Sequence, residues 1–121
     1  MSCRLVCLGL LFFVVCVHYE TPAGAQLPGY RWATGIGGEE DDATLGLVTD
    51  SSGVSFITGY CAGSPDFPGA PRFVCRGAYD AFVARFDVTG RATWAMRVGG
   101  TNSDYGQAIT LDPAGNVLVA G

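Results

Sequence analysis

Hydrophobic positions follow two different patterns along this chain. Leu5 to Val17 is an unbroken apolar run, whereas from residue 32 onward apolar residues occur in short, mostly alternating runs between polar and glycine-rich stretches. Alternation with a period of two is typical of β-strands, and no helical periodicity longer than one turn occurs after the first run. The pattern therefore predicts an all-β region behind a separate N-terminal segment.

The alternating region predicts short strands that are joined by hairpins and loops. We expect strands at 32–36, 43–49, 54–60, 79–86, 91–98, 107–111 and 116–120. The motif D-x-x-G closes three of the connections. Asp suits the first turn position because its carboxylate accepts backbone N–H groups, and Gly suits the last because it tolerates positive φ.

One signature occurs twice with a constant offset. One copy begins at Trp32 and the other at Trp94. Each copy reads W-A, followed by a Gly pair, a loop Asp, a D-x-x-G turn and a strand that ends in Gly. The two copies lie 62 residues apart without insertion or deletion. Such a period indicates a repeat architecture. We assign a structural role in the repeat to Trp32, Gly37, Gly38, Asp42, Asp50, Gly53, Asp87, Gly90, Trp94, Gly99, Gly100, Asp104, Asp112 and Gly115.

The strands of one period indicate how its sheets pack. Several strands, such as 117–120, are apolar on both faces, as expected of a sheet that is covered on both sides. Four-stranded sheets repeated radially are the blades of a β-propeller. We therefore expect an antiparallel four-stranded blade plus part of a second, which together form a segment of a β-propeller.

These motifs resemble a known family. W-A-x-x-x-G-G, the D-x-x-G turn, S-P-D-F-P at 64–68 and Y-D-A-F-V-A-R-F-D at 79–87 are similar to the SBBP-type β-propeller repeat. The first repeat spans about 32–93 and a partial second repeat spans 94–121. The resemblance implies a multi-bladed propeller in secreted or cell-surface proteins, often bacterial, and carries no shared catalytic motif.

The number of repeats affects the expected partners. A closed propeller needs at least about four blades, whereas this chain holds about one and a half repeats. We expect a fragment, a truncated gene model or a subunit that assembles. The expected partners are further propeller blades, supplied by missing chain or by other subunits.

Residues 1–25 have the features of a secretory signal peptide. Arg4 precedes the apolar run, and Ala23-Gly24-Ala25 provides a small-x-small cleavage pattern. The alternative is an uncleaved membrane anchor, but the run is shorter than the roughly 20 apolar residues that a spanning helix needs. We expect a secreted or cell-surface protein that begins at Gln26 and has no membrane contact after cleavage.

Cleavage would change the inventory of reactive side chains. It would remove Cys3, Cys7, Cys16 and His18, which leaves two cysteines and no histidine. A disulfide between Cys61 and Cys75 would close a 15-residue loop and stabilise the fold by about 3 kcal/mol. A free thiol pair and an intermolecular bridge are the alternatives.

Charge and composition argue against several function classes. Seven basic residues, all Arg, against eleven acidic residues give a net charge of −4, which argues against nucleic-acid binding. Without histidine, the mature chain has no Ser-His-Asp triad, no Cys-His pair and no His-ligated zinc. We therefore expect neither an enzyme nor a bound cofactor.

Two features have a functional alternative to a structural role. The acidic run Glu39–Asp42 suggests calcium through its carboxylates, but the copy at 101–104 keeps only Asp104, which favours a solvated loop. Trp32 and Trp94 suggest sugar-stacking platforms, although a recurring Trp is more often core between blades.

The sequence thus predicts a non-catalytic extracytoplasmic β-propeller segment that serves as a scaffold or binding module. Its ligand would be a protein or a carbohydrate. The alternative is the N-terminal fragment of a larger secreted propeller enzyme whose active site lies beyond residue 121.

Overall fold

The computed structural model describes residues 2–8, 11–18 and 29–121, and these ranges contain nine β-strands and no helix. The strands are β1 (Ser2–Leu8), β2 (Leu11–His18), β3 (Gly29–Ile36), β4 (Ala43–Thr49), β5 (Ser55–Cys61), β6 (Asp80–Phe86), β7 (Ala92–Val98), β8 (Ala108–Leu111) and β9 (Val117–Ala120).

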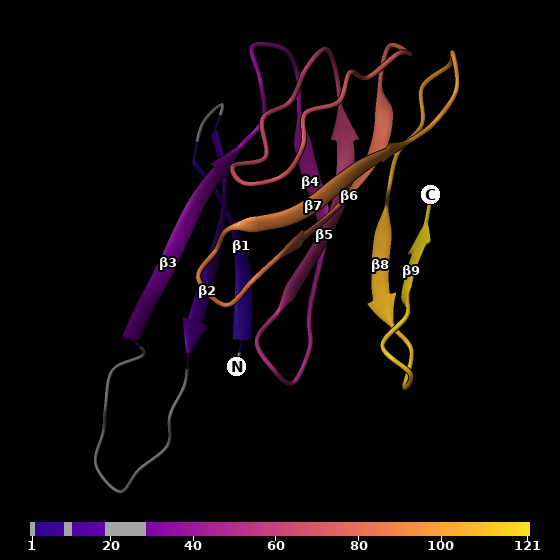
Figure 1. Ribbon diagram of the computed structural model, residues 1–121. Coiled ribbons are helices and arrows are strands. Elements are labelled where there is room, and N and C mark those ends of the chain that lie inside the picture. Colours follow the sequence, from indigo (N-terminus) through magenta and orange to yellow (C-terminus); the bar gives the residue numbers. More distant parts are fainter. Residues whose placement is uncertain (1, 9–10, 19–28) are drawn as a thin grey trace, which may run out of the picture.

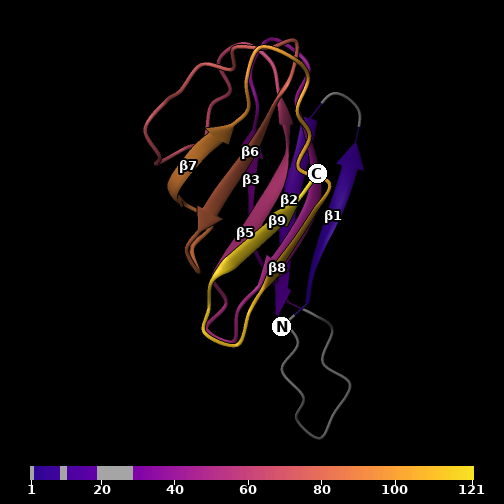
Figure 2. The ribbon, with the colours of Figure 1, turned by 90° about the vertical axis from the view of Figure 1, so that its right-hand side faces the viewer.

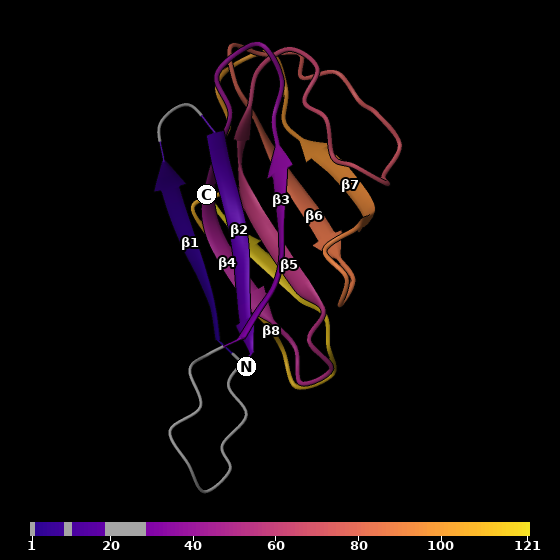
Figure 3. The ribbon, with the colours of Figure 1, turned by 90° about the vertical axis from the view of Figure 1, so that its left-hand side faces the viewer.

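The strands form three antiparallel sheets, in the orders β1-β2-β3, β4-β5-β6-β7 and β8-β9. The four-stranded sheet lies between the other two (Figure 1). β8 and β9 cover it on one side (Figure 2), and β1–β3 cover it on the other (Figure 3). The expected all-β fold, with one four-stranded blade and part of a second, is confirmed.

The middle sheet is out of phase with the sequence unit. It spans residues 43–98, and β3, which belongs to the same sequence unit as β4–β6, joins the preceding sheet instead. β8 and β9 lie 62 residues after the second part of β4 and the first part of β5. They therefore begin a second blade in the same way as β4 and β5 begin the first.

The face of the middle sheet toward β3 contains the main hydrophobic core. Trp32 of β3 is buried and stacks on Phe86 of β6, with ring centroids 6.2 Å apart. Phe67, from the loop between β5 and β6, packs edge-on against Phe82 at 5.1 Å. The core cluster consists of Trp32, Ile57, Cys61, Phe67, Cys75, Phe82, Ala84, Phe86 and Ala92.

The glycine that ends each copy of the signature, Gly59 or Gly121, has a packing reason. A Cβ at Gly59 would collide with the carbonyl oxygen of Ala43, and a Cβ at Gly121 would collide with that of Tyr105. Both carbonyl groups lie 16 residues before their glycine, so the same backbone contact recurs in both copies. Only glycine allows this approach.

The N-terminal region differs from the sequence expectation. β3 begins at Gly29 and not at Trp32, because it pairs with β2 along its whole length. β5 ends at Cys61, one residue beyond the strand expected at 54–60. Both β1 and β2 lie in the predicted signal peptide, whereas its cleavage site lies outside the described residues, so cleavage remains a prediction. Across the described ranges, no helix is long and apolar enough to cross a membrane.

Candidate functional site

The two ends of the stacked sheets are built differently (Figure 1). The three D-x-x-G turns join β4 to β5, β6 to β7 and β8 to β9 at one end. The three longer connections lie at the other end, which we call the loop end: 37–42, 62–79 and 99–107. The acidic run Glu39–Asp42 and the disulfide-bonded loop between β5 and β6 both lie at the loop end.

The three D-x-x-G turns share one geometry. The Oδ1 atom of Asp50 accepts the N–H groups of Ser52 and Val54 at 2.8 and 3.0 Å. Asp87 and Asp112 accept the N–H groups two and four residues later in the same way. The closing glycines have positive φ: Gly53 +87°, Gly90 +83° and Gly115 +84°. The Asp carboxylates and the closing glycines thus hold the backbone of the three turns.

The carboxylate of Asp42 organises the acidic loop. Its Oδ2 atom accepts the N–H of Gly38 at 2.6 Å, and its Oδ1 atom accepts that of Ala62 at 3.3 Å. In the second copy Asp104 accepts the N–H of Gly100 at 2.9 Å. Burial raises the pKa of Asp42 above its ordinary value of 3.8, although these hydrogen bonds oppose the rise. Asp42 thus binds the backbone of its own loop and that of the loop between β5 and β6.

The Gly pairs allow this loop geometry. Gly37 has a φ of +124°, and a Cβ there would lie 3.1 Å from Oδ2 of Asp42. At Gly99 a Cβ would collide with the carboxylates of Asp80 and Asp104. Gly38 approaches the backbone of Ser64, whereas no atom lies near a Cβ at Gly100.

The two tryptophans lie in different surroundings. Trp32 is 7% exposed and belongs to the core between two sheets. Trp94 of β7 is half-buried and meets Phe56 at 6.2 Å, on the face of the middle sheet that β8 and β9 cover only in part. Neither residue lines a pocket described below.

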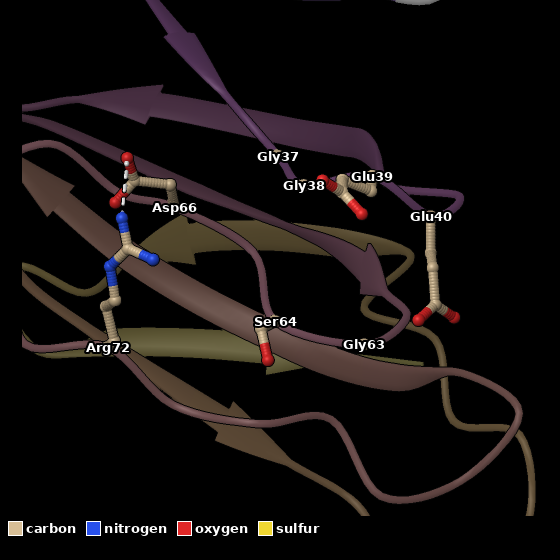
Figure 4. A pocket seen from close by; sticks show the side chains of 8 residues that line it. All are labelled: Gly37, Gly38, Glu39, Glu40, Gly63, Ser64, Asp66 and Arg72. Atoms are coloured by element: carbon tan, nitrogen blue, oxygen red, sulfur yellow. Dashed lines mark ion pairs between the residues drawn. The ribbon is translucent and has the colours of Figure 1, made fainter.

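A pocket of about 460 Å³ opens at the loop end. Its walls come from the β3–β4 loop and from the β5–β6 loop, as Figure 4 shows. The lining residues are Gly37, Gly38, Glu39, Glu40, Gly63, Ser64, Asp66 and Arg72. A smaller pocket of about 250 Å³, between β6–β7 and β9, is lined partly by Val83, Val98 and Val119.

Backbone bonds and a disulfide hold the walls of the larger pocket. Gly37 and Asp66 exchange two backbone hydrogen bonds of 3.2 and 2.9 Å, which tie the two loops together. Cys75 N–H donates to the carbonyl of Gly63 at 2.7 Å. The predicted Cys61–Cys75 disulfide is present, with the Cα atoms 6.3 Å apart. The walls of the pocket are therefore held by covalent and backbone bonds.

The chemistry of this pocket is polar and acidic. Arg72 pairs with Asp66 at 3.5 Å, but both side chains are mostly exposed, so the pair adds little stability. Glu39 and Glu40 are exposed on the opposite wall, and Figure 4 shows their carboxylates apart from the ion pair. No group of three or more His, Cys, Asp or Glu side chains within the described ranges could hold a metal ion. The calcium alternative for Glu39–Asp42 therefore gains no support.

The sequence reasoning missed one buried charge. Asp80, at the start of β6, is fully buried, accepts the N–H of Arg76 and pairs with Arg97 at 3.4 Å. Its Oδ1 atom has no hydrogen-bond partner among the described residues. The sequence carries one signal for this buried Asp: it stands at the start of a strand and is not part of a D-x-x-G turn.

The comparison with known families agrees with this architecture. The family described as "SBBP: Beta-propeller repeat" matches residues 93–121, which include β8, β9 and their D-x-x-G turn. Residues 31–59 are the copy of this segment 62 positions earlier in the chain. No curated protein matches the chain.

Proposed function

We propose that this chain, whose residues 93–121 match the SBBP β-propeller repeat, is a non-catalytic, extracytoplasmic scaffold that binds a polar ligand at the loop-end pocket. One observation carries the proposal. The recurring residues serve the backbone, whereas the pocket is built partly from residues that differ between the copies: Glu39 and Glu40 correspond to Thr101 and Asn102. Specificity accordingly resides in the variable loops.

The lining of the pocket defines the class of ligand. It offers two exposed carboxylates, the Asp66–Arg72 pair and the hydroxyl of Ser64, and it contains no aromatic side chain. Such groups suit a ligand with many hydroxyl or amide N–H donors, because carboxylates accept strong hydrogen bonds from both. A carbohydrate or a polar peptide segment has this character.

An extracytoplasmic location is supported by two features. The first is the apolar run and small-x-small pattern of residues 1–25. The second is the Cys61–Cys75 disulfide, since disulfides persist in oxidising compartments.

Further blades are the proposed structural partners. Met96 and Val98 of β7 are more than half exposed and share one face with the half-buried Trp94. The corresponding face of β3 carries Trp32 and Ile36, which pack against the middle sheet. The same contact at β7 would bury its exposed apolar side chains, each worth about 1.5–3 kcal/mol when fully buried.

The binding proposal is tested with the secreted full-length gene product on arrays of oligosaccharides and peptides. We expect saturable binding that Glu40→Gln and Arg72→Ala weaken by about tenfold each, as for the loss of one charge-assisted hydrogen bond. Arg91→Ala, an exposed Arg at the turn end, is the matched control and should bind normally. Chemical conversion of the bound ligand would contradict the proposal. An affinity that neither pocket substitution changes would contradict it as well.

A further inference from the structure

Three tyrosine rings form a cluster at the loop end. Tyr60 lies near the end of β5, Tyr79 directly precedes β6, and Tyr105 lies in the connection between β7 and β8. The ring centroid of Tyr60 is 5.0 Å from that of Tyr79 and 5.2 Å from that of Tyr105, and the other two centroids are 5.8 Å apart. All three side chains are half-buried and none belongs to the core cluster, so the rings are part of the surface.

Backbone hydrogen bonds hold the segments that carry the three rings. The N–H of Asp104 donates to the carbonyl of Tyr79 at 2.9 Å, and the N–H of Gly106 donates to the carbonyl of Gly59 at 3.0 Å. Tyr105 is therefore held on both sides, against Tyr79 itself and against the residue before Tyr60. The positions of the rings thus follow from backbone contacts between three segments that are distant in sequence.

The cluster departs from the repeat. Tyr105 corresponds to Ala43 in the first copy, and the acidic neighbour of the cluster, Asp41, corresponds to Ser103 in the second. The hydroxyl of Tyr79 donates to Oδ2 of Asp41 at 3.4 Å. Residues that hold the blade backbone recur at the 62-residue offset, whereas this ring and this carboxylate do not. The architecture of a blade therefore does not require them.

The cluster adjoins the larger pocket. Glu40 and Gly63 line that pocket, and a Cβ at Gly63 would lie 2.5 Å from Oε1 of Glu40. Asp41 follows Glu40 in the chain, and its carbonyl accepts the N–H of Ala62, next to Gly63, at 3.1 Å. Figure 4 shows this side of the pocket away from the ion pair that is drawn with a dashed line. The pocket itself has no aromatic lining, so the tyrosines add a kind of contact that it lacks.

The geometry of the rings favours a sugar over a cation. Neighbouring rings contact one another and leave no gap that could enclose an ammonium group. Two of the three contacts are edge-on, at 75°, and the edge of an aromatic ring is positive and so repels a cation. A sugar ring has an apolar C–H face that stacks on aromatic surface, and hydroxyl groups at its rim. The hydroxyls of Tyr60 and Tyr105 have no hydrogen-bond partner among the described residues, so they are open to such groups.

We propose that Tyr60, Tyr79 and Tyr105 form a stacking subsite for one unit of an oligosaccharide whose next unit lies in the larger pocket. The proposal rests on the binding role proposed above, and it narrows the ligand from polar molecules in general to saccharides of at least two units. The exposed carboxylate of Asp41, between the cluster and the pocket, accepts hydrogen bonds from the sugar hydroxyl groups.

The test presents the secreted full-length gene product to an array of oligosaccharides of one to six units, with hexalysine as the cationic peptide probe. Titration calorimetry then measures the affinity for the saccharide that binds most tightly. We expect Tyr105→Ala to weaken binding of chains of two or more units by about tenfold, as for the loss of one aromatic contact, and to leave binding of the monosaccharide unchanged. Tyr105→Phe keeps the ring and should bind within about threefold of the wild type.

Two controls accompany these variants. Val88→Ala changes an exposed apolar residue at the turn end and should bind normally. The first copy of the repeat has Ala at the position of Tyr105, so the Ala variant should fold, and its thermal unfolding checks this. In the wild type, saturation-transfer NMR from the tyrosine ring protons should reach the C–H protons of one sugar unit.

The outcomes separate this proposal from the pocket function. Binding of no oligosaccharide, or tighter binding of hexalysine than of any saccharide, would overturn the stacking subsite. If Glu40→Gln weakens binding and Tyr105→Ala does not, the pocket function stands and the stacking subsite fails. If Tyr105→Ala weakens binding and Glu40→Gln does not, stacking on the tyrosines stands and the pocket function fails.

Discussion

The indole ring of Trp32 lies directly against the backbone of Gly90. A Cβ at position 90 would come within 2.5 Å of the Cδ2 and Cε3 atoms of the ring. Trp32 belongs to β3, whereas Gly90 closes the turn between β6 and β7, so the contact joins two sheets. Gly90 therefore has two structural roles. It leaves room for the indole ring, and it adopts the φ of +83° that the turn requires.

The first prediction separates these two functions. Gly90→Ala should lower the free energy of unfolding by about 2–4 kcal/mol, because left-handed strain and overpacking against Trp32 add. Gly115→Ala is the matched control, with the same φ of +84° but no atom near its Cβ, and should cost only about 1–2 kcal/mol locally. Denaturant unfolding and hydrogen exchange measure the two costs. Equal costs would show that the Trp32 contact contributes nothing.

The second prediction concerns the acid titration of two turns. The side-chain hydroxyl of Thr89 and two backbone N–H groups hold the pKa of Asp87 below 3.8. The side-chain amide of Asn116 and nearby N–H groups do the same for Asp112. Because the folded pKa is lowered, the stability that each carboxylate contributes is present above pH 3.8 and is lost as the pH falls through the folded pKa.

NMR titration of the side-chain carboxyl groups tests this directly. Thr89→Val should raise the pKa of Asp87 and leave that of Asp112 unchanged, and Asn116→Ala should do the reverse. Each variant is thus the control for the other. A pKa for either Asp at or above 3.8 in the wild type would contradict the assignment.

The strand positions and turns could be predicted because their causes are local. Alternation sets the faces of β4–β7, and the D-x-x-G residues carry their own hydrogen bonds. The pairing of β3 with a strand from the N-terminal segment is non-local, so no pattern near residue 29 could predict it. The sheet boundary at residue 43, out of phase with the sequence unit, was missed for the same reason.

The third prediction concerns the disulfide beneath the pocket. Replacing both Cys61 and Cys75 with Ala should lower the free energy of unfolding by about 3 kcal/mol, because the unfolded chain regains the freedom of a 15-residue loop. Reductant should destabilise the wild type to a similar extent and leave the double variant unaffected. If reductant left the wild-type free energy of unfolding unchanged, that result would contradict a structural disulfide.

The candidate pocket was only partly visible in the sequence. Glu39 and Glu40 were identified as an acidic run, but Asp66 and Arg72 lie in a loop whose path depends on the Gly37–Asp66 backbone pairing. Such a contact between loops has no local signature. The burial of Phe67 at 3% exposure shows that this loop packs into the core as well.

The fourth prediction concerns the N-terminus of the secreted protein. Intact mass and N-terminal sequencing should show that the chain in the medium begins at or near Gln26. Ala25→Arg should reduce cleavage, because it removes the last small residue of the small-x-small pattern. Secreted chain that begins at Met1 would contradict a cleaved signal peptide.

The central claim is that β4–β7 form one blade and that β8 and β9 begin the next blade against it. NMR measurement of short interstrand proton contacts tests this most directly. The account predicts contacts between Ile57 and Ala84 and between Ala84 and Ala95 within the blade, and between Gly46 and Ile109 across the two sheets. Contacts within each sheet but none between Gly46 and Ile109 would contradict the stacked-blade arrangement.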